Sequence, residues 1–180
     1  MSISDSVVED YQVTNLYVLR QVDIFEDLKP NHLQFIHDTC TLKTYNAGEI
    51  IFKENSPSKE FYVIMDGEVD IQVDPDAISG GTDEHQPSTI ATLRRGQCFG
   101  EVALVDQGLR SATARCGSET AKLLVIDRED FVRLLYNDYE MGFIVMRNLA
   151  ADLSFKIRQT NLMVRESLTY NDSRSHHHQA

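Results

Sequence analysis

Apolar residues near the beginning of the chain recur at roughly helical intervals. Between residues 7 and 22 this pattern comprises the apolar residues Val8, Tyr11, Leu16 and Leu19, with the polar Asn15 at one of its positions. A second, shorter helical pattern runs from Leu33 to His37, and Pro30 marks its start because proline suits the first turn of a helix. The chain is therefore predicted to begin with two helices.

From residue 41 the apolar period falls towards two, which is typical of β-strands. The first such positions, on either side of a turn at Gly48, are Leu42, Tyr45, Ile50 and Phe52. In residues 61–73, Val69 and Ile71 alternate with polar neighbours, and Asp66-Gly67 is a tight-turn signal. This segment therefore predicts a β-hairpin with one buried face.

The second half of the chain returns to helices after two further strands. Residues 74–88 are polar and contain several glycines and prolines, so they predict a long, mobile loop before a strand at 89–93. A strand at 121–126 precedes Asp127, which can cap a helix over 128–135. The order of elements is thus helices, strands and helices again.

A final long helix is predicted over residues 139–166. Its repeating positions alternate steps of three and four, and they are Met146, Leu149, Leu153, Ile157, Thr160 and Val164. We expect Met146, Leu149, Leu153 and Ile157 to pair two copies as a homodimer, with packing on their own chain as the alternative. Residues 169–180 are polar and are predicted to be disordered.

These elements indicate an α+β protein, an antiparallel roll or barrel flanked by helices. We divide it into a helical lead (1–22), the roll (23–137), a long C-terminal helix (138–168) and a tail (169–180). A length of 180 residues, with 42% hydrophobic and 25% charged residues, suits one soluble domain. The apolar runs are too short to cross a bilayer, so no membrane partner is expected.

Charge and cysteine content narrow the choice of partners. The net charge is −11 and lysine and arginine are not concentrated in one segment, which disfavours direct nucleic-acid binding. The N-terminal residues are acidic and polar, unlike a secretory signal, so a cytoplasmic location is expected. The spacing of Cys40, Cys98 and Cys116 favours buried, reduced thiols over disulfides or a metal cage.

Residues 99–114, with the sequence FGEVALVDQGLRSATA, carry the chemistry of an anion site. Gly100 permits close approach to the backbone, and a short helix from Glu101 would present the amides of Val102 and Ala103 to an anion. Arg110 adds a charged, two-pronged donor for phosphate oxygens. A carboxylate in such a site fits if Glu101 accepts a sugar hydroxyl while Arg110 offsets its charge.

The order and spacing of these residues resemble the cyclic-nucleotide-binding domain family of catabolite activator proteins, kinase regulatory subunits and nucleotide-gated channels. The resemblance spans about residues 22–166 and is strongest in the family's phosphate-binding cassette. The matching positions are Phe99, Gly100, Glu101, Val102, Ala103, Leu104, Arg110, Ser111, Ala112 and Thr113. It implies a jelly-roll-like β-roll, or double-stranded β-helix, with N-terminal helices and a long C-terminal hinge or lid helix.

By the same resemblance, Arg110 holds the phosphate and Glu101 the ribose 2′-hydroxyl, while Gly100 and the Val102 and Ala103 amides line the pocket. The ligand is cAMP or cGMP, and no other cofactor is expected. A hydroxyl at Ser111 can reach the amino group of guanine in this family, but related cAMP binders also carry serine there and use it on the phosphate. We favour cAMP. The final helix covers the purine near Phe155, Lys156 and Arg158, and its movement signals to an unidentified downstream protein.

Four alternatives remain open from the sequence. A haem or redox sensor would need a ligand, for which Cys98 is the candidate. A vestigial pocket would leave a pure interaction module. An enzyme is not expected, because no histidine is predicted beside Glu101, Asp130 or Cys98 and no metal-ligand spacing appears. Without a helix-turn-helix after the last helix, the chain is a free-standing sensor or the sensor part of a transcription regulator.

Overall fold

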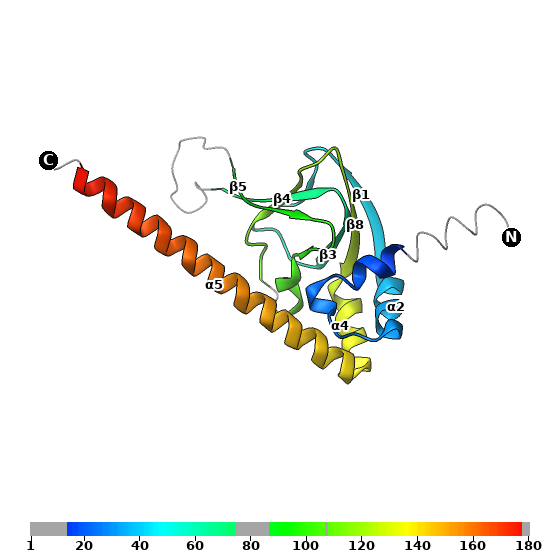
Figure 1. The fold of residues 1–180 in the computed structure, drawn as a ribbon. Helices are drawn as coiled ribbons and strands as arrows, with labels where there is room; N and C mark the ends of the chain where they lie inside the picture. The colour runs from blue at the N-terminus through cyan, green and yellow to red at the C-terminus, as the bar shows by residue number, and fades with distance from the viewer. Residues whose placement is uncertain (1–13, 75–86, 107, 178–180) are drawn as a thin grey trace.

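The computed structural model describes residues 14–74, 87–106 and 108–177, with side chains as far as residue 165. Its centre is a pair of four-stranded antiparallel sheets (Figure 1). The first sheet has the order β1 (Cys40–Asn46), β8 (Thr120–Asp127), β3 (Glu60–Asp66) and β6 (Cys98–Phe99). The second has the order β2 (Ile50–Phe52), β7 (Thr113–Cys116), β4 (Glu68–Val73) and β5 (Ser88–Arg94). This is the predicted α+β roll.

Helices lie before, between and after the strands. They are a short segment at 14–19, η1 (Asp23–Phe25), α2 (Pro30–Thr39), η2 (Glu101–Leu104), α4 (Arg128–Asn137) and α5 (Tyr139–His177). α2 begins at Pro30, as predicted. The Asp127 carboxylate accepts hydrogen bonds from the backbone amides of Glu129 and Asp130, which confirms the predicted cap of α4. Residues 7–13 of the first predicted helix lie outside the described residues.

The predicted hairpin over residues 61–73 is wrong. β3 pairs with β8 and β6, whereas β4 pairs with β5 and β7, so the two strands belong to different sheets. Gly67 joins them in a left-handed conformation with φ of +81°, where an added Cβ would lie 2.2 Å from the Thr120 carbonyl oxygen. The turn signal at Asp66-Gly67 therefore marks a bend that carries the chain from one sheet to the other.

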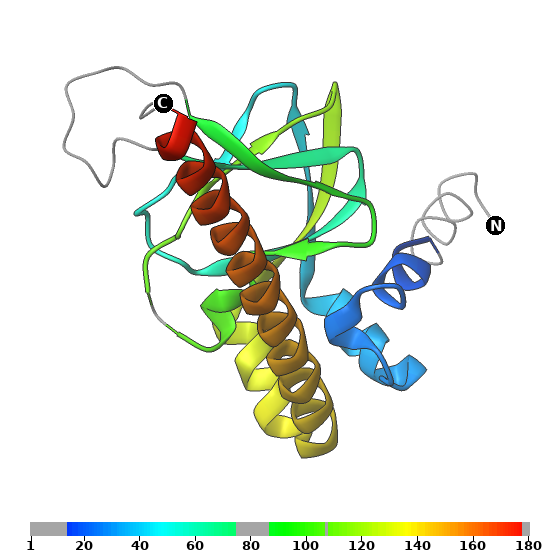
Figure 2. The same ribbon diagram turned by 60° about the vertical axis from the view of Figure 1, so that its left-hand side comes forward.

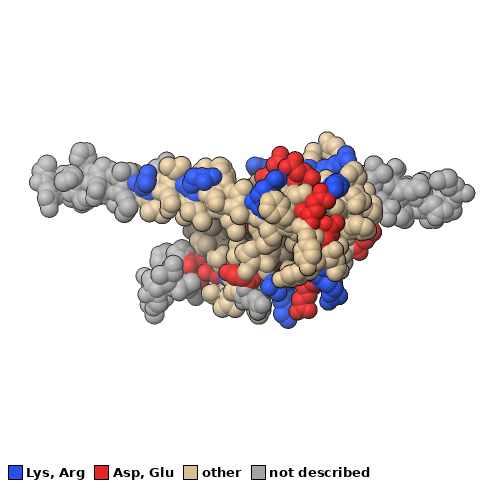
Figure 3. Space-filling view, turned by 90° about the horizontal axis from the view of Figure 1, so that it is seen from below, with Lys and Arg blue, Asp and Glu red and all other residues tan. Residues whose placement is uncertain are grey.

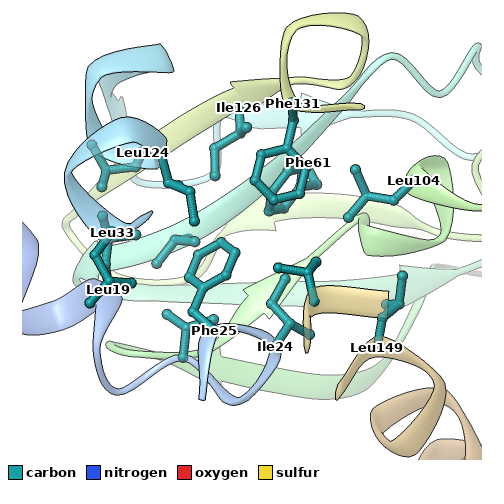
Figure 4. Packing of buried hydrophobic residues seen from close by; sticks show 14 of the residues in the cluster. Leu19, Ile24, Phe25, Leu33, Phe61, Leu104, Leu124, Ile126, Phe131 and Leu149 are labelled. Carbon is teal, nitrogen blue, oxygen red and sulfur yellow. The ribbon is translucent and has the colours of Figure 1, made fainter. Parts of the chain in front are cut away.

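β3 and β8 are buried on both faces, because a core lies on each side of their sheet. Between the sheets pack Tyr62, Ile64, Val69, Phe99, Ala114, Cys116, Ala121, Leu123 and Val125. On the other side, Phe61 and Leu124 meet the helices, where the rings of Phe25 and Phe131 pack edge-to-face against Phe61 (Figure 4). The continuous apolar run at 61–65 is the sequence signature of such a doubly covered strand.

α5 is longer than the sequence analysis predicted. It runs to His177 rather than Glu166, so the expected disorder from residue 169 is not found in 169–177, and 178–180 lie outside the described residues. After Gly142 the helix contains neither proline nor glycine, so no residue breaks it. Within the described ranges, no helix is long and apolar enough to span a bilayer.

The first part of α5 packs on its own roll, and the rest projects past the sheets (Figure 1). Met141, Val145 and Leu149 are buried in the core beside the N-terminal segments. Of the predicted dimer seam, Leu149 is buried and Leu153 partly buried, whereas Met146 and Ile157 are exposed. The seam is therefore divided between the protein's own core and solvent.

Candidate functional site

A cavity of about 530 Å³ lies between the second sheet, residues 96–112 and α5, which crosses in front of the sheets in Figure 2. From the predicted cassette it is lined by Phe99, Gly100, Glu101, Val102, Arg110, Ser111 and Ala112. From the second sheet it is lined by Ile71, Ile90, Ala91 and Leu93, and from α5 by Asp152, Lys156, Gln159, Thr160 and Met163. The volume is in the usual range for a small-molecule site.

Gly100 shapes the entrance to the cassette. The strand β6 ends at Phe99, whose ring stacks on Tyr62 with centroids 4.9 Å apart. Gly100 then takes a left-handed conformation with φ of +75°, and η2 begins at Glu101. A Cβ at Gly100 would lie 2.5 Å from Arg110 Nη1, so the absence of a side chain leaves room for the arginine.

Arg110 is buried and keeps an unused donor. Its guanidinium lies over the Phe52 ring, its Nη2 donates to the Glu60 carbonyl at 2.5 Å, and its Nη1 donates to the Gly100 carbonyl at 3.4 Å. Its Nε is buried without a hydrogen-bond partner among the described residues. Burial lowers the pKa of Arg110 below its ordinary value, but a guanidinium stays charged at neutral pH. The site thus offers a cation that can still bind an anion.

Glu101 is also buried, and its charge is balanced by α5 rather than by Arg110. Its Oε1 lies 2.7 Å from Lys156 Nζ, which is also 2.9 Å from Asp152 Oδ2. Burial alone would lower the pKa of Lys156, but the two carboxylates outweigh that effect and raise it above the ordinary value. Arg110 instead uses backbone carbonyls, so the expected direct compensation of Glu101 by Arg110 is replaced by a lysine from the long helix.

Three of the matching cassette residues, Ala103, Leu104 and Thr113, do not line the cavity. Ala103 is fully buried, and its amide donates to the Gly100 carbonyl at 3.2 Å. Thr113 lies on β7, where its hydroxyl accepts a hydrogen bond from the Glu54 amide. Ser111 and Ala112 do line the cavity, as does Val102. Residues alternate between the faces of a strand, which turns Thr113 away from Ala112.

Of the three predicted lid residues, Lys156 alone lines the cavity. Phe155 lines a separate depression beside Asp23 and Glu26, and Arg158 is not among the lining residues. The helix instead presents residues that the sequence analysis missed, and these are Asp152, Gln159, Thr160 and Met163. They are three, four and seven positions from Lys156, so the helical period could have identified this face once Lys156 was placed.

The apolar wall of the cavity was also missed. Ile90 and Ala91 on β5 and Ile71 on β4 face the cassette across the cavity. Ile90 is 57% exposed, although it is a large aliphatic residue in a regular strand. An exposed isoleucine beside charged groups is suited to cover the face of an apolar ring.

The geometry does not favour haem or thiol chemistry at this cavity. Burial raises the pKa of the Cys98 thiol to about 12, so it is protonated at neutral pH and is a poor metal ligand or nucleophile. In the described part of the chain no cluster of three histidine, cysteine or acidic side chains could hold a metal.

On the face seen in Figure 3, basic and acidic side chains lie beside one another.

Known proteins resemble this chain in sequence and in fold. The family model described as cyclic nucleotide-binding domain matches residues 42–138, which is over half of the chain. Human cGMP-dependent protein kinase 2 is 32% identical over 114 residues, 63% of this chain and 14% of that protein. The cAMP-dependent protein kinase regulatory subunit of Schizosaccharomyces pombe is 31% identical over 140 residues, 77% of this chain and 30% of that protein. The chain thus spans less than a third of these relatives.

A solved structure with the same fold is the catabolite activator protein of Thermus thermophilus. It superposes with a TM-score of 0.65 at 27% identity, covering 79% of this chain and 61% of that one. The family match spans β2 to β8, η2 and α4, so the walls of the cavity that come from the second sheet and the cassette lie within the matched region. The wall that α5 contributes lies beyond residue 138.

Proposed function

The chain belongs to the cyclic nucleotide-binding domain family, and on that premise we propose that it binds cAMP in the cavity beneath α5 and signals through that helix. The observation that carries the proposal is the convergence of Glu101 and Arg110. Both are buried, they carry opposite charges, and they line one cavity. Neither residue is needed to pack a roll, whereas a cyclic nucleotide offers an anionic phosphate and a sugar hydroxyl that use both.

In the proposed complex the phosphate lies against Arg110. The guanidinium is held by the Phe52 ring and two backbone carbonyls, and its buried Nε has no hydrogen-bond partner among the described residues. A ligand phosphate would receive a charge-assisted hydrogen bond from this side chain. The amide of Ala103 would join it only by leaving the Gly100 carbonyl. We therefore assign Arg110 as the main phosphate ligand.

The ribose in this proposal lies against Glu101 and the purine against the apolar wall. Glu101 can accept the 2′-hydroxyl, and Ile71, Ile90 and Leu93 provide a surface for the base. We favour adenine over guanine, because the wall is aliphatic and adenine carries fewer polar groups to desolvate. Ser111 lines the cavity and is available to the phosphate or the base.

The proposed signal passes through α5 to a downstream protein. The helix contributes Lys156, Gln159, Thr160 and Met163 to the cavity wall, so a ligand that contacts them changes the free energy of α5 in that position. Met146 and Ile157 are exposed on the same helix and are proposed to pair two copies. We propose that the protein is a cytoplasmic regulator with reduced cysteines, without enzymatic activity or direct nucleic-acid binding.

A second candidate function is that of an interaction module. An apolar groove of about 280 Å³ lies where α4 meets α5, and its rim includes exposed Tyr136, Tyr139 and Phe143. Such a surface is suited to contact another protein. In this alternative the nucleotide pocket is vestigial, or the chain is the sensor part of a transcription regulator that contacts further segments through this groove.

Titration calorimetry with cAMP and cGMP tests the proposal. We expect both to bind at one site per chain, with cAMP binding more tightly. If neither nucleotide, at concentrations up to about 1 mM, releases heat or raises the melting temperature, the proposal is wrong and the interaction module is favoured.

A further inference from the structure

A lysine from the long helix is the ion-pair partner of the acid at the sugar end of the cavity. Lys156 Nζ lies 2.7 Å from Glu101 Oε1. The Glu101 side chain is only 6% exposed, whereas that of Lys156 is 47% exposed. A buried carboxylate without a partner is strongly destabilising. The orientation of Glu101 therefore depends on Lys156 more than the orientation of Lys156 depends on Glu101.

We propose that Lys156 is a positioning residue for ribose recognition, which rests on the proposed function. The described contacts engage Oε1 of Glu101, and a carboxylate has two oxygens with about four acceptor sites. Lys156 therefore holds the carboxylate in a fixed orientation, in which Oε2 can accept the 2′-hydroxyl of a nucleotide. In this role Lys156 recognises the sugar through Glu101, and not the purine, which the lid prediction had assigned to it.

Lys156 is itself fixed by a second acid on the same helix. Asp152 Oδ2 lies 2.9 Å from Lys156 Nζ, one helical turn earlier. The pKa of Lys156 is raised by the two carboxylates, so the lysine stays protonated throughout the physiological range. Asp152, Lys156 and Glu101 thus form a row of alternating charges from α5 to η2.

This row joins the projecting part of α5 to the cassette. The described side chains from residue 154 to 165 are all exposed, so apolar burial does not hold this part of the helix to the roll. Lys156 lies within that exposed stretch and still reaches a buried residue of η2. Ribose binding at Glu101 would therefore act on α5 through one charged contact, independently of the base.

Calorimetry with cAMP and 2′-deoxy-cAMP tests this role, because only the first ligand carries the hydroxyl. The parent, Lys156→Gln and Lys156→Arg are compared. The matched control is Lys29→Gln. It removes the same charge and breaks the pair between Lys29 and Glu140 of α5, and neither of these residues lines the cavity. Circular dichroism and melting confirm folding, and Lys156→Met carries the same expectation if Lys156→Gln does not fold.

We expect the parent to prefer cAMP over 2′-deoxy-cAMP by about tenfold or more, since a hydrogen bond to a charged group is lost in the deoxy ligand. Lys156→Gln should reduce that preference at least about fivefold, chiefly by weakening cAMP binding, and Lys156→Arg should restore it. Lys29→Gln should leave both affinities within about twofold of the parent, as for a surface pair.

Two results would overturn the inference, and they are distinguishable. If the parent binds cAMP but Lys156→Gln keeps the same preference over the deoxy ligand, or binds cAMP more tightly, then Lys156 does not position Glu101 and the proposed function stands. If the parent binds neither nucleotide, the proposed function is wrong and the positioning role falls with it.

Discussion

The guanidinium carbon of Arg110 lies 4.0 Å from the centroid of the Phe52 ring. The two residues are far apart in the sequence but come from neighbouring segments, β2 and the segment that precedes its partner strand β7. Stacking on an aromatic face suits guanidinium better than ammonium, and it fixes the plane of the fork before an anion arrives. The proposed phosphate contact is therefore preorganised by packing.

Arg110→Lys tests this preorganisation. A lysine retains the positive charge but loses the stacked fork, so we expect cAMP affinity to fall about 10- to 100-fold, as for the loss of a charge-assisted hydrogen bond. Arg94→Lys serves as the control, because Arg94 pairs with Glu68 on the surface and does not line the cavity. Calorimetry measures both, and equal affinities for parent and Arg110→Lys would contradict the stacked-fork assignment.

Gly100→Ala should destabilise the fold and impair binding together. Its φ of +75° and the predicted 2.5 Å approach of a Cβ to Arg110 Nη1 require the arginine to move. Gly96→Ala is the matched control, because φ is +84° there but the nearest heavy atom to a Cβ is 3.7 Å away. We expect about 1–2 kcal/mol of destabilisation at Gly96 from the backbone alone, and more at Gly100. Urea unfolding measures the difference between the two variants. Equal losses of unfolding free energy would show that Arg110 moves away from the added Cβ without an energetic penalty.

Phe61→Ala should strongly destabilise the roll. Phe61 is fully buried, and its ring contacts those of Phe25 and Phe131 at centroid distances of 6.4 and 5.0 Å. A large cavity in such a cluster costs about 3–5 kcal/mol of unfolding free energy. Phe143→Ala, at a side chain that is 68% exposed, should cost less than about 1 kcal/mol. Chemical unfolding of both variants would disprove this core assignment if the two losses were similar.

Cys98 should make stability depend on alkaline pH. Burial raises the pKa of its thiol to about 12, above the unfolded value of about 8.5. The folded state therefore keeps a proton that the unfolded state releases, so this contribution is complete below about pH 8.5 and is lost as pH rises towards 12. Relative to Cys98→Ala, the parent should lose about 2 kcal/mol of unfolding free energy between pH 8 and pH 10. Urea unfolding of both proteins at the two pH values measures this loss. Equal changes in unfolding free energy for the parent and Cys98→Ala would contradict the raised pKa of Cys98.

Local signals were sufficient for several elements. Pro30 marks the start of α2, Asp127 caps α4, and the cassette order from Phe99 to Arg110 predicted a glycine that permits close approach to the backbone, a short helix and an arginine at one anion site. Each of these features depends on residues within a few positions of one another, so the chain carries them in its order. The family match agrees with that interpretation.

Long-range pairing could not be deduced in the same way. Asp66-Gly67 is compatible with a hairpin or with a bend between sheets, and the choice depends on β8, which pairs with β3 from residues far along the chain. The polar composition of residues 169–180 predicts disorder, whereas α5 continues to His177 because no proline or glycine interrupts it after Gly142. The lid residues differ from the prediction for a third reason. Which residues of α5 line the cavity depends on the rotation of the helix about its axis, and its packing partners set that rotation.

By itself, the sequence determined the roll, the helices around it and the pair Glu101 and Arg110, because spacing and turn chemistry are local properties. Only the tertiary structure decided which charges meet. Lys156 is 55 positions from Glu101, and a cavity brings them together with Asp152 and the aliphatic wall of β5. Burial, and with it the strength of every charged contact in the site, is a property of the folded chain, because the low-dielectric surroundings exist only after both sheets and α5 have packed.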